Sequence, residues 1–359
     1  MIRDFYGFGK NKKHKNREKR ISMMGFVFLA LSAALLYAAR NSPSFGEWYA
    51  VTVYPALTAA VGGFFGLLPF SAVELLLYFF IVGFLFYGFT HWRRWRQILN
   101  FTFFLASFLF FLYTVNCGIN YYRRPFSDFL DYKAEQYSVE ELSDLLDYLT
   151  EQVNREAADL DGGKLTAGET AAESVKAMEG LGQMYPALSG FYPRPKKLLI
   201  SRILSVQQLA GVYSPFTIEA NYNGEMTAYN IPHTACHELS HLRGFMREDE
   251  ANFIGFLACI SSEDRYFNYS GYLTGWIYAG NALADEDREL YGKYWARLEE
   301  SVKDDLRQNS AFWDRFDGRT AKAAETLNDT YLKANRQTEG VKSYGRAVDL
   351  LLAWYKAVK

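Results

Sequence analysis

Two histidines and one glutamate form the most informative chemical pattern in the sequence, in the pentapeptide HELSH. His237 and His241 are four residues apart, so on an α-helix both imidazoles lie on one face and can reach a single Zn²⁺. Glu238 follows the first histidine and can reach a metal-bound water as a general base. The spacing therefore predicts His237 and His241 as zinc ligands and Glu238 as the catalytic base.

The same five letters can also arise by chance, as a surface helix with two solvated histidines. The flanking residues favour a buried helix instead, because residues 234–236, Leu239, Ser240 and Leu242 are all uncharged. Arg243 is the one charge next to the pattern, and Gly244 is a suitable helix stop.

A catalytic zinc site needs a third protein ligand, and the next predicted helix, starting near residue 247, offers acidic residues. Glu248 is the expected ligand, with Glu250 as its rival. Asn252, one turn after Glu248, could hydrogen-bond a ligand from outside the metal shell. An acidic first turn that complements the helix dipole is the alternative for either glutamate. This helix also carries small residues on one face, at Ala251, Gly255 and Ala258. They predict close packing against the HELSH helix.

The arrangement resembles the gluzincin class of zinc metallopeptidases. In membrane proteases of the CAAX-prenyl endopeptidase type, HExxH is followed by a Glu-x-x-Ala-Asp helix, and small bacterial peptidases carry Glu-x-Glu-Ala-Asn. The stretch Glu248-Asp249-Glu250-Ala251-Asn252 is similar. Over nearly its full length the chain also resembles an uncharacterised bacterial domain-of-unknown-function family. Its members have a few N-terminal spans, a Pro-Phe-Ser segment (here residues 69–71) and an external HExxH domain. These resemblances imply architecture and a zinc site but no substrate.

Peptide hydrolysis also needs a hydrogen-bond donor for the developing oxyanion. No histidine follows His241, so the donor must be a tyrosine, an arginine, a backbone amide or His233. The candidates in the C-terminal stretch are Tyr331, Tyr344 and Arg346. Tyr344 is the expected catalytic donor, with core packing as the alternative role for any single tyrosine. For His233 the alternative is a structural role at the helix start.

The first 120 residues predict a membrane region. Residues 1–20 contain eight Lys/Arg against Asp4 and Glu18, a basic tail followed at once by apolar segments. The expected spans are 21–39, 71–89 and 98–117, each about 20 residues long. A short loop with Arg93, Arg94 and Arg96 separates the second and third spans. Because basic loops stay in the cytoplasm, the tail and this loop are expected inside.

Residues 51–70 are uncharged and long enough to cross, but contain Pro55, Gly62, Gly63, Gly66 and Pro69. We expect this piece to be interfacial or re-entrant, because a fourth crossing would move the arginine-rich loop outside. Residues 121–359 are then an extracytoplasmic domain of a multi-pass protein in a bacterial cytoplasmic membrane.

The fold class expected for 121–359 is mostly α, zincin-like, with a small β element. Ser138 to Glu141 matches a capping box, starting a helix that runs to about residue 160. Further helices are expected at 166–185, 284–308, 319–336 and 340–357. Residues 216–222 alternate as a half-buried strand does. The segment 215–223 is either an edge strand that aligns substrate or an ordinary core strand. Cys236 and Cys259 could form a disulfide or remain buried thiols.

The sequence therefore predicts a membrane-anchored zinc peptidase acting on extracytoplasmic peptides or proteins. The alternative is a non-enzymatic sensor or scaffold with a structural or vestigial zinc site. The expected partners are the lipid bilayer and a peptide or protein substrate, with no nucleic acid. The oligomeric state is left open.

Overall fold

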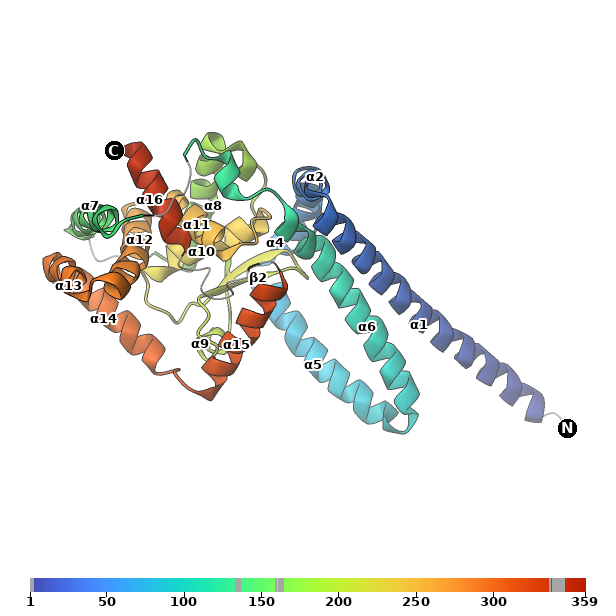
Figure 1. Cartoon of the computed structure of the whole chain (residues 1–359). Coiled ribbons are helices and arrows are strands. Elements are labelled where there is room, and N and C mark those ends of the chain that lie inside the picture. Colours follow the sequence, from blue (N-terminus) through green and yellow to red (C-terminus); the bar gives the residue numbers. More distant parts are fainter. Residues whose placement is uncertain (1–2, 133–136, 159, 161–164, 336, 338–345) are drawn as a thin grey trace.

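The computed structural model describes residues 3–132, 137–158, 160, 165–335, 337 and 346–359. The expected fold class, mostly α with a small β element, is confirmed. Figure 1 shows a helical domain on one side and three long helices extending away from it on the other. These long helices are α1 (Arg3–Asn41), α5 (Ala72–His91) and α6 (Trp95–Asn116).

Three segments are long and apolar enough to cross a membrane: Glu18–Asn41, Pro43–Gly66 and Ala72–Asn116. The last one is folded back at η3 (Trp92–Arg94) into α5 and α6, which form a hairpin in Figure 1. The described helices α1, α5 and α6 therefore cover the spans expected at 21–39, 71–89 and 98–117. Which side of the membrane each end faces stays a prediction.

The segment expected to be interfacial or re-entrant is helical but irregular. Its pieces are α2 (Pro43–Trp48), η1 (Tyr49–Val53), α3 (Tyr54–Leu57), η2 (Thr58–Gly62) and α4 (Gly63–Gly66). In Figure 1 α2 is seen almost end-on, whereas α1, α5 and α6 are seen lengthwise. A Cβ at Gly62 would lie 3.1 Å from the Ile218 carbonyl, and one at Gly66 would lie 3.1 Å from Pro193. The glycines of this segment thus allow it to pack directly on the domain.

A buried polar junction joins α5 to the sheet. The Glu219 carboxylate accepts hydrogen bonds from the backbone N–H groups of Ala72 and Val73, the first residues of α5. The Lys196 ammonium pairs with the same carboxylate and also donates to a backbone carbonyl. In the other direction, Glu74 of α5 accepts from the backbone of residues 199 and 200. Each carboxylate satisfies backbone donors that would otherwise be left without partners.

The sheet has the strands β1 (Lys196–Lys197), β2 (Gly211–Ser214) and β3 (Glu219–Tyr222), in the order β1-β3-β2. β3 pairs with β1 in parallel and with β2 antiparallel, Val212 opposite Asn221. The strand expected within 215–223 exists, but the edge-strand interpretation of that segment is wrong. β3 is central because β1 and β2 cover its two sides, so β1 and β2 are the two edge strands.

The remaining helices build the domain around the HELSH helix. They are α7 (Val139–Ala158), α8 (Ala167–Met184), α9 (Arg202–Ser205), α10 (Asn230–Leu242), α11 (Glu248–Ile260), α12 (Arg265–Glu286), α13 (Arg288–Arg297), α14 (Glu300–Asp314), α15 (Arg319–Ala334) and α16 (Ala347–Val358). Short 3₁₀ turns are η4 (Gly118–Tyr122), η5 (Phe126–Phe129) and η6 (Pro186–Leu188). The buried faces of α7, α10, α11, α12 and α16 contribute to one hydrophobic core.

The start of α7 agrees with the sequence prediction, and the helical stretch expected at 284–308 does not. The capping box is confirmed, since Ser138 and Glu141 each accept a hydrogen bond from the backbone N–H of the other. The single helix expected over 284–308 is wrong. It is divided between α12, α13 and α14. Asp287 leaves the helical conformation and caps α13 through the N–H of Leu290, and Leu298 and Glu299 are extended between α13 and α14. The part of the last expected helix before residue 346 lies outside the described residues.

Candidate metal centre

The HELSH helix α10 and the acidic helix α11 meet through a tight turn. α10 is followed by Gly244 in a left-handed conformation with φ of 90°, which a side chain would strain. The chain reverses there, and Glu248 is the first residue of α11. A Cβ at Gly255 would lie 3.2 Å from both the His233 Nε2 and the His237 backbone nitrogen. The predicted close packing of the small face of α11 on α10 is confirmed, and it brings Glu248 back over the histidines.

Three electron-rich atoms converge at this point. The Nε2 atoms of His237 and His241 are 3.1 Å apart. The Glu248 carboxylate lies 3.3 Å from the His237 Nε2 and 3.7 Å from the His241 Nε2. Ligands at about 2.0–2.2 Å from a tetrahedral zinc ion are separated by roughly 3.3–3.6 Å. The 3.3 Å distance is to the Glu248 Oε2 and the 3.7 Å distance is to its Oε1, and all three distances lie within about 0.2 Å of that range. Two imidazole nitrogens and a carboxylate are also ligand types that zinc prefers.

The protonation of His241 supports the same interpretation. Its Nδ1 lies 2.8 Å from the Phe245 carbonyl oxygen, which can only accept, so Nδ1 carries the hydrogen and Nε2 faces the cluster. Burial alone would lower the pKa of His241, but the Glu248 carboxylate outweighs it and raises that pKa to about 9. Burial would likewise raise the pKa of Glu248, but the two histidines hold it well below its ordinary value. The cluster thus attracts a positive charge, which a proton or a metal cation can supply.

Glu238 lies beside this cluster and does not join it. Its side chain is buried, and its Oε2 has no hydrogen-bond partner among the described residues. Burial raises its pKa to about 7, against the opposing effect of His237 and His241. Gly211 of the edge strand makes room for it, since a Cβ there would lie 2.8 Å from the Glu238 Cγ. A buried carboxyl with a free oxygen is suited to accept and return a proton.

The other predicted site residues have different surroundings. Glu250, the rival ligand, points away and accepts from the Phe126 backbone N–H, with Arg247 3.3 Å away. The backbone carbonyl of Asn252 lies 3.1 Å from the His233 Nε2, while the Asn252 side-chain nitrogen is buried without a partner. His233 thus ties α10 to α11, and burial, with His237 nearby, lowers its pKa to about 3. Asn252 makes no hydrogen bond to a candidate ligand in the described part of the chain.

The cluster opens into a cleft of about 530 Å³. Its walls come from α10, α11, the edge strand β2, the end of α6, α12 and α15. Tyr278 of α12 lines this cleft close enough for Glu248 to raise its pKa, in addition to the larger effect of burial. Its hydroxyl makes no hydrogen bond within the described residues. Tyr331 also lines the cleft, and its hydroxyl accepts a hydrogen bond from that of Tyr121 at 3.1 Å. Tyr344 lies outside the described residues.

Sequence reasoning did not single out Tyr278 or Gly211. Both come from elements distant in sequence from the HELSH pattern, and neither carries a local signal that distinguishes it from the other tyrosines and glycines. The three cysteines are free and buried, so the thiol interpretation of Cys236 and Cys259 agrees with the structure and a disulfide between them does not.

Comparisons with known proteins give a family and no function. A family model described as a protein of unknown function (DUF3810) matches residues 49–352, which is most of the chain and includes the whole cluster. No curated protein and no solved structure matches it. The expected resemblance to an uncharacterised family is confirmed, whereas the resemblance to gluzincins stays a prediction.

Proposed function

The chain belongs to the DUF3810 family, whose function is unknown, and we propose that it is a membrane-anchored zinc-dependent peptidase. The observation that carries this proposal is that His237, His241 and Glu248 lie together inside a cleft, beside the buried Glu238, one oxygen of which has no hydrogen-bond partner among the described residues. The resemblance of this pattern to gluzincins supports the same reaction class.

The residues have separate tasks in this mechanism. His237, His241 and Glu248 would hold the zinc ion, which when bound polarises a water molecule and the substrate carbonyl. Glu238 accepts a proton from the attacking water at its free oxygen and passes it to the nitrogen of the departing amine. The peptide C–N bond breaks, and the products are a carboxylate and an amine.

Tyr278 is our candidate for the oxyanion donor among the described residues. Tyr278 lines the cleft and its hydroxyl makes no hydrogen bond within the described residues, whereas the Tyr331 hydroxyl accepts from Tyr121 and also lies 3.6 Å from the Cys117 Sγ. A single donor aimed at the developing negative charge contributes on the order of 10²–10³ to turnover. Tyr344, the donor expected from the sequence, stays a second candidate.

The edge strand β2 would align the substrate. Gly211, Val212 and Tyr213 line the cleft next to Glu238, and one side of β2 is not covered by β3 or β1. An extended peptide can add to such an edge through main-chain hydrogen bonds, which do not depend on side-chain identity. This geometry favours hydrolysis of an unfolded segment of polypeptide.

Metal content and turnover together test the proposal, on the full-length protein purified in detergent. We expect about one zinc per chain in the wild type and in Glu238→Gln, and none in His237→Ala. Mass spectrometry of a randomised peptide mixture should then show new termini with the wild type alone. If both proteins retain zinc and the wild type gives no termini beyond those seen with Glu238→Gln, the sensor or scaffold function is indicated instead. A wild type without zinc would overturn both.

A further inference from the structure

The lengths of α5 and α6 locate the membrane surface relative to the cleft. α5 has 20 residues and α6 has 22, which at 1.5 Å per residue gives about 30–33 Å, the thickness of the hydrocarbon core. Arg93, Arg94 and Arg96 belong to the turn between them and the start of α6. Figure 1 shows this turn at the end of the α5–α6 hairpin that is away from the domain. The opposite membrane surface therefore lies level with Ala72 and Asn116, where both helices join the domain.

The domain presents apolar side chains at this level. Five exposed large hydrophobic residues surround the start of α5, and we call them the apolar rim: Phe64, Leu67, Phe191, Leu199 and Ile200. Leu199 and Ile200 donate their backbone N–H groups to Glu74 in the first turn of α5. Phe191 is in contact with Gly63, 3.7 Å from a Cβ placed there. An exposed apolar group next to a membrane helix is suited to the bilayer interface.

The metal cluster lies close to the same surface. Cys117, which ends α6, has its Sγ 3.7 Å from the Sδ of Met246, and Met246 is two residues before Glu248. Tyr113, in the last turn of α6, and Cys117 both line the cleft. The ligand cluster is therefore on the order of 10 Å from the end of α6, given about 3.3–3.6 Å per residue of extended chain.

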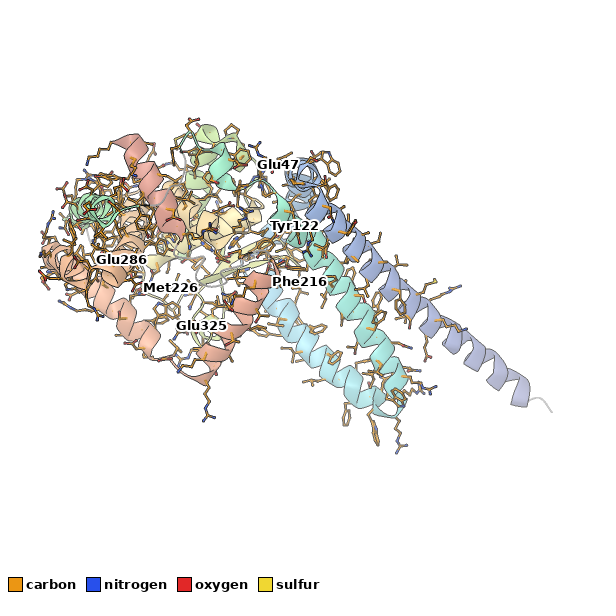
Figure 2. All side chains as sticks on the ribbon, viewed as in Figure 1. Glu47, Tyr122, Phe216, Met226, Glu286 and Glu325 are labelled. Atoms are coloured by element: carbon orange, nitrogen blue, oxygen red, sulfur yellow. The ribbon has the colours of Figure 1, made fainter. Side chains whose placement is uncertain are left out.

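The edge strand is attached to the end of α6 as well. The Tyr213 hydroxyl donates to the Asn116 carbonyl at 3.0 Å, and the Asn116 side-chain nitrogen donates to the Pro215 carbonyl at 2.7 Å. Figure 2 shows Phe216, which lines the cleft, where the domain meets the ends of α5 and α6. A peptide that pairs with β2 therefore lies next to the membrane surface.

We propose that the substrate is a membrane-anchored polypeptide, cut by hydrolysis a few residues outside its transmembrane helix. This inference rests on the proposed peptidase function and adds the substrate class. A distance of roughly 10 Å corresponds to about three residues of extended chain, so cuts should fall roughly three to eight residues from the hydrocarbon boundary. A substrate anchored in the same bilayer also meets the cleft at a high effective concentration.

The test uses the zinc-loaded full-length protein in liposomes. One substrate is a randomised segment of about 30 residues fused to a single transmembrane helix and reconstituted in the same vesicles. The other is the same segment without the helix, added at equal total concentration. Mass spectrometry maps each cut, counted from the transmembrane helix, and Glu238→Gln provides the background.

We expect cuts clustered roughly three to eight residues from the helix, and at least tenfold slower cleavage of the free segment. Cuts spread evenly along the anchored segment, or equal rates on both substrates, would overturn the membrane-anchored class and leave the peptidase function intact. No cut above the Glu238→Gln background on either substrate would overturn the peptidase function, and this inference with it.

A variant in the apolar rim sharpens the result. Leu199 is exposed and does not line the cleft, so Leu199→Asp should leave cleavage of the free segment unchanged. We expect it to slow cleavage of the anchored segment at least threefold, because a carboxylate in the apolar rim weakens its contact with the bilayer and moves the cleft away from the membrane surface. Equal slowing of both substrates would mean that the rim has no role in substrate choice.

Discussion

Two buried carboxylate sites in this molecule differ in how completely they are satisfied. At the junction between α5 and the sheet, Glu219 is matched by two backbone N–H groups and the Lys196 ammonium. In the cleft, the donors around Glu238 and Glu248 are fewer. Glu238 has an oxygen without a hydrogen-bond partner among the described residues, and Glu248 lies 3.3 Å from the His237 Nε2 and 3.7 Å from the His241 Nε2.

This difference indicates a structural role for the junction and a binding or catalytic role for the cleft. A buried charge is tolerated when opposite charge and hydrogen bonds surround it, and such a site stabilises one arrangement of helices and strands. The cluster in the cleft groups two histidines with a carboxylate, and the surrounding fold holds these ligating groups together. The cluster is therefore the place where a metal, a proton or a substrate is to be expected.

The largest effect should come from Glu248→Gln, compared with Glu250→Gln two residues away on the same helix. The first change removes a candidate ligand. We expect zinc affinity to fall by more than the roughly 10- to 100-fold loss seen when a group supporting a ligand is removed, and turnover to disappear. Glu250→Gln keeps an acceptor for the Phe126 N–H and should retain zinc. Isothermal titration calorimetry with zinc measures both affinities. Equal affinities in the two variants would contradict the assignment of Glu248, and not Glu250, as the ligand.

Glu219→Gln tests the structural side of the comparison. It leaves the Lys196 charge buried without its counter-charge, which should lower the free energy of unfolding by about 3–5 kcal/mol. Thermal unfolding in detergent measures this, and zinc content should not change in the folded protein. Glu263→Gln removes an exposed ion pair with Lys176 and is the matched control, with no measurable change expected. Similar stabilities of the two variants would contradict the role given to the junction.

Tyr278→Phe removes one hydroxyl from the cleft. If that hydroxyl stabilises the oxyanion, kcat should fall by roughly 10²–10³ with zinc content and KM nearly unchanged. Tyr331→Phe is the control, because Tyr331 lines the same cleft but its hydroxyl already contacts the Tyr121 hydroxyl and the Cys117 Sγ. A larger loss in Tyr331→Phe than in Tyr278→Phe would reassign the donor.

Gly211→Ala should give the smallest effect. Its new Cβ would meet the Glu238 Cγ and the Thr234 Cγ2, each at 2.8 Å, and so displace the base without removing it. We expect turnover to fall on the order of tenfold to hundredfold, with zinc retained. Gly180→Ala, in α8 with open space around it, is the control and should be neutral or slightly stabilising. Full activity in Gly211→Ala would show that the edge strand does not position Glu238.

Local patterns in the sequence were sufficient for several features. Helical spacing places His237, Glu238 and His241 correctly, because residues four apart share a face whatever the rest of the fold does. The Ser138 capping box and the apolar spans likewise depend on neighbours within one or two turns. The sequence also predicted a helix starting near residue 247, and α11 begins at Glu248.

Long-range packing decided what local patterns could not. The choice between Glu248 and Glu250 depends on the turn at Gly244 and on Phe126. The backbone N–H of Phe126, more than a hundred residues away in the chain, donates a hydrogen bond to Glu250. The identity of the edge strand depends on which strands flank β3. The proximity of the cleft to α6 depends on the contact of Cys117 with Met246. Such relations arise from contacts between distant segments, and periodicity along the chain carries no record of them.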